Sequence, residues 1–463
     1  MANLRGRSLE DEFNGIVSDL AGDVNGRAQA ASYLASSHPI SDAEKTRSWV
    51  LTPKVFGSAE LEILSSAAET MGRIVEKVTA RYLTDADFRA LFGLPEGIEE
   101  LALIPTGYEQ LVPFARVDVI FDEESGDFKV VGVVTDSSTG MTTSVDVTRA
   151  VQLTESYRRF AERHPRIETF DVTGGVIDAL RETYTSWANA DTGTRNPERP
   201  VVGIVDYPES ATPGEFSDIV ERLADEGVFA RFVDIRDLRI EEGAGIRRLV
   251  DSEGPIACVY RRALLSEMLD KPCEGVDALV EASRRGIACV IGGFRTWPAS
   301  TLELFSVLSS DAIEDVLDPF ELAFVRAHVP ETHRLTRDSD LAPYLAERER
   351  WLARPAGPYS AGEVVSGADC QDRDDWWRVL LACAEEGGTV EAYEPAYRTP
   401  AYLGGPADGG EVGAEAELVE ASNVLGLFLF RGKFGGIYAR GGYDGIAGPW
   451  SHRVTMGSLV VSD

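Results

Sequence analysis

Short apolar runs alternate with helical patterns between residues 201 and 291, and this alternation constrains the fold more than any other feature of the sequence. A helix with apolar periodicity is predicted over 214–226. The buried strands that flank and follow it are predicted at 201–205, 229–233, 257–260 and 287–291. Strands that alternate with helices are typical of a parallel sheet covered on both faces. The segment therefore predicts an α/β unit.

The segments on either side have different patterns. Residues 1 to about 100 are predicted to be helical, because apolar residues recur at helical spacing between Leu61 and Val78. Residues 114–121 and 128–134 alternate around a polar turn and predict an antiparallel hairpin. A second hairpin is predicted near the C-terminus, with Arg440 at its end.

Composition and charge exclude several classes of function. The 463 residues include 45 basic and 77 acidic side chains, for a formal charge of −32. An anionic polymer or membrane would be repelled over most of such a surface. No apolar run approaches the roughly 18 residues that a membrane span needs, and the N-terminus lacks an apolar signal core. We expect a cytoplasmic protein with small-molecule substrates, no nucleic acid and no membrane, and a homo-oligomer is left open.

Arg116 and Asp118 are two residues apart in the first predicted hairpin strand. Side chains alternate along a strand, so both lie on one face of the sheet. One interpretation is a phosphate-binding arginine beside a metal-binding aspartate. The other is an ion pair within the sheet.

Asp136, Ser137 and Ser138 follow the second strand of that hairpin. Polar side chains at the edge of a sheet commonly face a ligand, but Asp and Ser also stabilise turns. Both interpretations stay open. No Walker-type loop, dinucleotide fingerprint or Gly-x-Ser-x-Gly elbow is present with the right neighbours, and His328 and His333 are poorly spaced for a metal.

Taken together, the order of these pieces resembles the glutathionylspermidine-synthase-like, circularly permuted ATP-grasp ligases. The pieces are Arg116-x-Asp118, the hairpin with Asp136-Ser137, the unit at 201–235, Val259-Tyr-Arg-Arg, Phe294-Arg before a helix, Leu352-Ala-Arg-Pro, and Val424-Leu-Gly with Gly432-Lys and Gly436-Ile-Tyr-Ala-Arg440. The resemblance implies an α/β fold with α+β lobes. It comprises a helical N-terminal region (1–110), a first ATP-grasp-like part with hairpin and substrate loop (111–195), a parallel-sheet, Rossmann-like pre-ATP-grasp domain (196–328), and ATP-grasp lobes with the C-terminal hairpin (329–463).

The resemblance also implies an activity and its residues. It implies a ligase that joins a small, amino-acid-like carboxylate to an amine through an acyl-phosphate, using ATP and Mg²⁺. Arg116 and Arg440 would stabilise the transferred phosphoryl group, and Asp118 would bind Mg²⁺. The remaining implied sites are Glu391, Tyr393 and Glu394 at adenine, Arg354 at a phosphate, and Asp136, Ser137 and Ser138 at the substrate.

Several positions depart from the family pattern. Gly132 and Val134 stand where side-chain oxygens for Mg²⁺ are expected, and neither offers one. Leu302 and Arg354 stand where lysines are expected. These departures motivate a second hypothesis. In it the ATP-grasp fold persists without nucleotide chemistry, in a small-molecule binding protein or an enzyme of different chemistry.

Overall fold

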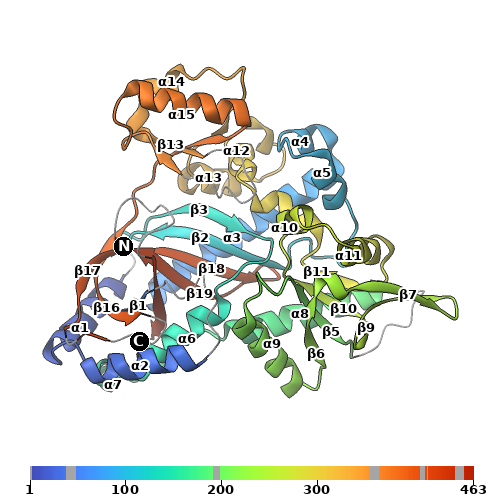
Figure 1. Ribbon diagram of the computed structural model, residues 1–463. Coiled ribbons are helices and arrows are strands. Elements are labelled where there is room, and N and C mark those ends of the chain that lie inside the picture. Colours follow the sequence, from blue (N-terminus) through green and yellow to red (C-terminus); the bar gives the residue numbers. More distant parts are fainter. Residues whose placement is uncertain are drawn as a thin grey trace.

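The computed structural model describes residues 3–37, 48–190, 199–354, 364–406, 412–413, 415–443 and 453–462. Figure 1 shows a large central sheet with helices around it, a parallel-sheet unit beside it, and a small lobe above it. The protein is therefore a mixed α/β protein with several sheets, one of them entirely parallel.

The parallel sheet has the strand order β11–β10–β5–β6, as the alternation predicts. Its elements are β5 (Val202–Asp206), α9 (Pro213–Asp225), β6 (Ala230–Asp234), β10 (Cys258–Arg261), α10 (Leu265–Asp270), α11 (Glu274–Arg285) and β11 (Cys289–Ile291). The chain runs from β5 to β6 on one side and later returns to β10 on the other side of β5. The point between β5 and β10 is therefore where the strand order reverses.

A small antiparallel sheet lies between β6 and β10 in the sequence and was not predicted. Its strands are β7 (Arg239–Gly243), β8 (Ile246–Asp251) and β9 (Gly254–Ile256). Most of β7 and the first half of β8 are exposed and charged, so they lack the apolar alternation on which strand prediction depends.

The large sheet has the order β17–β16–β1–β20–β19–β18–β2–β3, with β4 paired to β20. Its strands are β1 (Ser48–Phe56), β2 (Phe114–Phe121), β3 (Phe128–Val134), β4 (Ile167–Glu168), β16 (Arg398–Pro406), β17 (Leu418–Ser422), β18 (Val424–Phe430), β19 (Lys433–Gly442) and β20 (Arg453–Val461). Both predicted hairpins, β2–β3 and β18–β19, are confirmed. Strands from three of the four expected parts share this one sheet, and the boundaries at 110, 195 and 328 stay predictions.

The prediction of a purely helical N-terminal region is wrong at residues 48–56. These residues form β1, which pairs with β16 and β20 near the other end of the chain. Pro53 and Lys54 interrupt the apolar pattern, and the register shifts between Val50 and Lys54. Since β1 has no neighbouring hairpin partner, nothing local in the sequence indicates a strand.

Helices cover both faces of the large sheet (Figure 1). Apolar residues of α3 share a core with Val117 and Leu425 on one face, and Val147 of α6 packs in another core with Leu459 of β20. The helices outside the parallel unit and the small lobe are α1 (Gly6–Asp19), α2 (Val24–Ser37), α3 (Ser58–Thr84), α4 (Ala86–Ala90), α5 (Glu96–Ala102), α6 (Met141–Gln152), α7 (Glu155–Arg163), α8 (Val172–Ala190), α12 (Glu303–Leu308) and α13 (Pro319–His328).

The small lobe has its own sheet and core. Trp351, Trp376 and Leu380 are buried in that core. Its elements are β12 (Thr332–Arg334), α14 (Ala342–Ala346), β13 (Trp351–Arg354), β14 (Val365–Ser366), α15 (Arg373–Glu386) and β15 (Thr389–Ala392), with the strand order β12–β15–β13–β14. Among the described residues, no helix combines the length and apolar character that crossing a membrane requires.

Candidate functional site

Two strands of the large sheet bring Arg116, Asp118 and Arg440 together. Arg116 and Asp118 lie on one face of β2, and Arg440 lies on β19, with β18 between them. Gly426 of β18 stands directly opposite Asp118. A Cβ atom at that position would lie 2.7 Å from Cδ of Arg116. The missing side chain at Gly426 therefore leaves room for the three charged side chains. We call these three residues, Arg116, Asp118 and Arg440, the arginine cluster.

The charged groups of the arginine cluster bind one another. Arg116 donates from Nε to Oδ1 of Asp118 over 2.7 Å and from Nη2 to Oδ2 over 3.1 Å, and Arg440 donates from Nη2 to the same Oδ2 over 2.5 Å. Burial opposes ionisation of Asp118. The two guanidinium charges outweigh it, so the pKa of Asp118 lies below its usual value. The ion pair that the sequence allowed is present.

The arginine cluster has one side that is open to solvent. Two guanidinium groups face one carboxylate, and both lie near the ring of Tyr438, at 5.8 Å for Arg116 and 5.7 Å for Arg440. The Arg440 side chain is 31% exposed, whereas that of Arg116 is 8% exposed. Nη1 of Arg116 also donates to the carbonyl of Thr139 over 2.7 Å. Arg116 thus joins the sheet to the loop that follows β3.

The residues around Asp118 do not fit Mg²⁺. Both of its carboxylate oxygens already accept hydrogen bonds from arginine. Its neighbours across the sheet are Gly132 and Gly426, which carry no side-chain oxygen, and Val134 stands opposite Arg116. In the part of the chain that the structure describes, no group of three or more His, Cys, Asp or Glu side chains is placed to hold a metal. A divalent cation prefers several oxygen ligands and would be repelled by the two arginines.

Asp136, at the end of β3, forms contacts with residues of the parallel-sheet unit. Its Oδ1 pairs with the guanidinium of Arg261, and its Oδ2 accepts from the backbone N–H of Leu265 over 3.1 Å. Arg261 also donates to the carbonyls of Gly292 and Ala263. Because both charged side chains are almost completely buried, this pair joins two parts of the fold. These contacts join residues that are far apart in the sequence and do not stabilise a local turn, and the substrate-binding role of Asp136 stays a prediction.

Ser137 and Ser138 make similar contacts to the next arginine. The hydroxyl of Ser137, which has a φ of 53°, donates to the carbonyl of Arg262 over 2.5 Å. The carbonyl of Ser138 accepts from Nη1 of Arg262 over 2.9 Å. Arg262 is buried and ion-paired with Glu215 at 2.7 Å. The consecutive arginines after the strand at 257–260 are the sequence signal for this junction.

A polar pocket of about 200 Å³ opens where the β3 loop meets the parallel sheet. It lies at the carboxyl ends of β5 and β10, where the strand order reverses, which is where α/β sheets usually bind ligands. Its lining comes from both sides of the junction and comprises Arg116, Val134, Asp136, Ser137, Thr139, Asp206, Ser210, Thr212, Arg262, Leu264 and Glu267. Arg116 therefore belongs to both the arginine cluster and the pocket wall.

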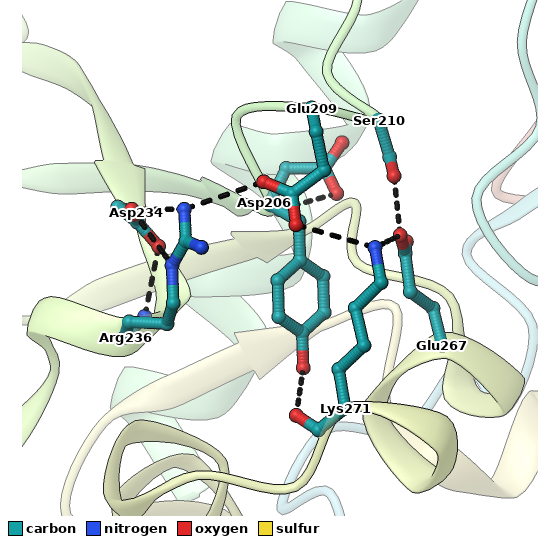
Figure 2. Close-up of polar contacts among 8 residues, drawn as sticks. Asp206, Glu209, Ser210, Asp234, Arg236, Glu267 and Lys271 are labelled. Carbon is teal, nitrogen blue, oxygen red and sulfur yellow. Dashed lines mark hydrogen bonds and ion pairs between the residues drawn. The ribbon is translucent and has the colours of Figure 1, made fainter.

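A network of charged side chains extends from Ser210 and Glu267 of the pocket wall (Figure 2), and we call it the rim of the pocket. Ser210 donates to Glu267, and Nζ of Lys271 lies 2.7 Å from Glu267 and 3.2 Å from Glu209. Arg236 continues the network to Glu209 at 3.3 Å. These contacts link the loop after β5 to α10. Sequence analysis missed this rim because its members come from separate loops and helices.

Asp206 is the buried acid at the end of β5. Burial raises its pKa to about 7, although the charge of Arg262 and the hydrogen bond from the N–H of Tyr207 act in the opposite direction. Oε2 of Glu267, in the same wall, is buried and has no hydrogen-bond partner among the residues that the structure describes. The pocket therefore combines acidic groups with Arg262 and Arg116.

The residues expected at adenine and at a phosphate lie on the small lobe. Nε of Arg354 lies 2.9 Å from Oε2 of Glu391 on the neighbouring strand, so these two charges compensate each other. The N–H of Tyr393 donates to the carbonyl of Arg350 over 2.7 Å. Glu394 lies 3.5 Å from Nζ of Lys129, a β3 lysine that sequence analysis did not consider.

The remaining departure from the family pattern is Leu302. It lies at the N-terminal end of α12 and is half-buried. Its side chain offers no charge to a phosphate.

The structure brings together Arg116, Asp118 and Arg440, and joins them through Arg116 to the loop of Asp136. Arg354 and Glu391 form a separate pair on the small lobe.

Comparison with known proteins finds the fold but no sequence relative. No protein-family model matches the chain, and no curated protein matches it. Among solved structures, the fold matches that of glutathione synthetase-like proteins, as the resemblance implies.

The structure concerned is that of a glutathione synthetase-like effector from Globodera pallida in its apo form. It superimposes with a TM-score of 0.62, covering 95% of this chain and 97% of the effector, at 12% sequence identity. A likeness at that identity establishes a glutathione synthetase-like ATP-grasp fold and carries no activity with it.

Proposed function

We propose that the protein is a carbon–nitrogen ligase that joins a small, amino-acid-like carboxylate to an amine at the expense of ATP. The observation that carries this proposal is the double position of Arg116. Its guanidinium lines the polar pocket and also belongs to the arginine cluster with Arg440. A phosphoryl group held by the two arginines would therefore lie beside a substrate bound in the pocket.

The chemistry of the pocket supports substrates that carry both charges. Arg262 and Arg116 suit a carboxylate, while Asp206 and Glu267 suit an ammonium group. In the proposed reaction a substrate carboxylate oxygen attacks the terminal phosphorus, and ADP leaves. The amine then displaces phosphate from the acyl-phosphate to form the amide. The arginines would stabilise charge on the transferred phosphoryl group, which is usually the largest contribution to such catalysis.

A second candidate function is supported by a different observation. Asp118 is fully engaged by arginines, and Gly132, Val134 and Leu302 offer no replacement ligands. A protein with this site that has lost nucleotide chemistry would still have the polar pocket. It would then act as a small-molecule binding protein or as an enzyme of other chemistry.

Isothermal titration calorimetry with ATP separates the two candidates. Under the ligase proposal the protein binds ATP with micromolar affinity and releases phosphate when amino acids and amines are added in pairs. The matched variants are Arg440→Gln, which should abolish phosphate release, and Arg326→Gln, an exposed arginine on α13 that should leave it unchanged. Absence of binding at millimolar ATP would remove the ligase proposal and favour the second candidate.

A further inference from the structure

We infer that a second cavity, which lies beside α6, binds a small organic acid whose carboxylate is held by Arg149. The cavity has a volume of about 260 Å³, against about 200 Å³ for the polar pocket, and the two share no lining residue. Drug-sized ligands occupy pockets of about 300 Å³ and more, so this cavity suits a smaller molecule. The inference goes beyond the proposed function and does not depend on it.

The helix α6 contributes two neighbouring rows of side chains to the cavity. Ser144, Thr148 and Gln152 form one row at intervals of four residues, and Val145 and Arg149 form the next. Residues at this spacing lie on one face of a helix. A different face of α6 carries the apolar residues that pack in the core with β20. The two rows therefore give the cavity a wall of hydroxyl, amide and guanidinium groups.

A second wall of the cavity is apolar. It comprises Phe170 and Val172, at and before the start of α8, and Ile437 of β19. The ring of Phe170 packs edge-on against Phe434, with 5.8 Å between the ring centroids. A Cβ atom at Gly436 would lie 2.7 Å from Cγ2 of Val172, so the glycine lets this segment approach β19. These side chains offer an apolar surface to the body of a ligand.

The buried hydroxyl groups of the cavity already donate their protons to the backbone. Ser144 donates to the carbonyl of Met141 over 2.8 Å, and Thr148 donates to the carbonyl of Ser144 over 2.7 Å. Ser458 donates to the carbonyl of Ile437 over 3.3 Å. A ligand that needs hydrogen-bond donors must therefore find them in other side chains of the wall.

Arg149 and Gln152 supply such donors. Neither side chain forms a hydrogen bond or an ion pair within the part of the chain that the structure describes. Asp146, one turn before Arg149, instead accepts from the hydroxyl of Tyr33 over 3.2 Å. Among the described residues that line the cavity, Arg149 is the one that carries a charge. A single guanidinium beside an apolar wall matches a ligand with one carboxylate and an apolar body.

The test is a calorimetric titration of the full chain without ATP or ligase substrates. Benzoate and hexanoate are the probes, and benzamide and hexanamide are their uncharged controls. We expect at least one acid to bind with a dissociation constant in the millimolar range or below. Its amide should bind about tenfold more weakly or worse, because it lacks the charge that pairs with Arg149. No binding of either acid, or equal binding of acid and amide, would overturn the inference.

Two variants locate the binding. Arg149→Gln should weaken binding of the acid about tenfold or more and leave that of the amide unchanged, since only the acid pairs with the guanidinium. The matched control is Arg326→Gln, which should leave both unchanged. Val145→Trp should abolish binding of both probes by filling the cavity.

The outcome does not depend on every variant folding. Arg149 is exposed, so its replacement should leave the melting temperature unchanged even if Val145→Trp does not fold. Acid binding that is equal in Arg149→Gln and Arg326→Gln would place the acid elsewhere and overturn the inference. Failure to release phosphate from ATP would refute the ligase proposal alone, since this titration contains no ATP.

Discussion

Two clusters of charged side chains at the large sheet differ in how far they are exposed to solvent. In the arginine cluster, Arg116 and Arg440 share one carboxylate, Asp118. In the second, which we call the lysine cluster, Lys54 of β1 lies between Glu10 and Glu123. Nζ of Lys54 is 2.8 Å from Oε2 of Glu10, and all three side chains of this cluster are almost completely buried.

The acidic residues of the two clusters have pKa values that are shifted in opposite directions. The lysine cluster is closed to solvent, so its second carboxylate can become neutral only by taking a proton. Burial, then the charge of Glu123, raises the pKa of Glu10 to about 8 despite the opposing effect of Lys54. The arginine cluster cannot lose a proton, because guanidinium stays charged, but Arg440 is partly exposed. The comparison shows that burial beside a second carboxylate raises the pKa of one carboxyl group, whereas two neighbouring guanidinium groups lower the pKa of another.

The largest effect on stability is expected at Lys54. Lys54→Met leaves two carboxylates in the core without a cation, and breaking a buried ion pair in this way costs about 3–5 kcal/mol. Denaturant unfolding measures the loss. The matched control is Lys77→Met, whose side chain is 41% exposed and should change the free energy of unfolding by about 1 kcal/mol or less. A similar small change for Lys54→Met would mean that the lysine cluster is not closed.

The next effect is a pH dependence of stability to which the lysine cluster contributes and the arginine cluster does not. The pKa of Glu10 is about 8 in the folded protein, above its ordinary value of 4.5. Its contribution to stability is therefore fully present below pH 4.5 and is lost as pH rises towards 8. The melting temperature of the wild-type protein should therefore fall as pH rises across this range. The melting temperature of the Glu10→Gln variant should fall less.

In the arginine cluster, the contribution of the acidic residue to stability depends on pH in the opposite direction. The pKa of Asp118 is depressed, so its contribution is present above the unfolded value and is lost only as pH falls through the folded one. Asp118 should therefore add nothing to the slope between pH 5 and 8. A Glu10→Gln variant with the wild-type slope would refute the assignment of that slope to Glu10.

A smaller effect on stability is expected at Arg440, although the effect on function should be large. Arg440→Gln removes a partly exposed ion pair, so it should cost about 1 kcal/mol of unfolding free energy at most, since much of its charge is screened. Under the ligase proposal, ATP-driven amide formation should be lost in the same variant. If the Arg440→Gln variant retained turnover, Arg440 would not bind the transferred phosphoryl group and would have no role in catalysis.

The smallest effect is expected at the rim of the pocket. Lys271→Met removes an exposed lysine that is bound to Glu267 and Glu209 (Figure 2). Surface pairs of this kind contribute about 0–1 kcal/mol. The melting temperature should hardly change. A large drop would show that the rim holds the loop after β5 in place.

Local patterns predicted much of the fold. The alternation between 201 and 291 gave the parallel sheet, and both hairpins follow from residues that are neighbours in the sequence. The glutathione synthetase-like fold was suggested by the order of pieces and is confirmed by a structural match. The strand β1 was not predicted, because its partners lie at the other end of the chain.

The sequence by itself determined that Arg116 and Asp118 share a face of a strand, because side chains alternate along any strand. It also determined which residue types flank them, including the glycine at position 132. Only the tertiary structure decided that Arg440 reaches Asp118 across Gly426, and that Asp136 is bound by Arg261. Those contacts depend on the register of strands and on packing between units far apart in the chain, and no local periodicity encodes either.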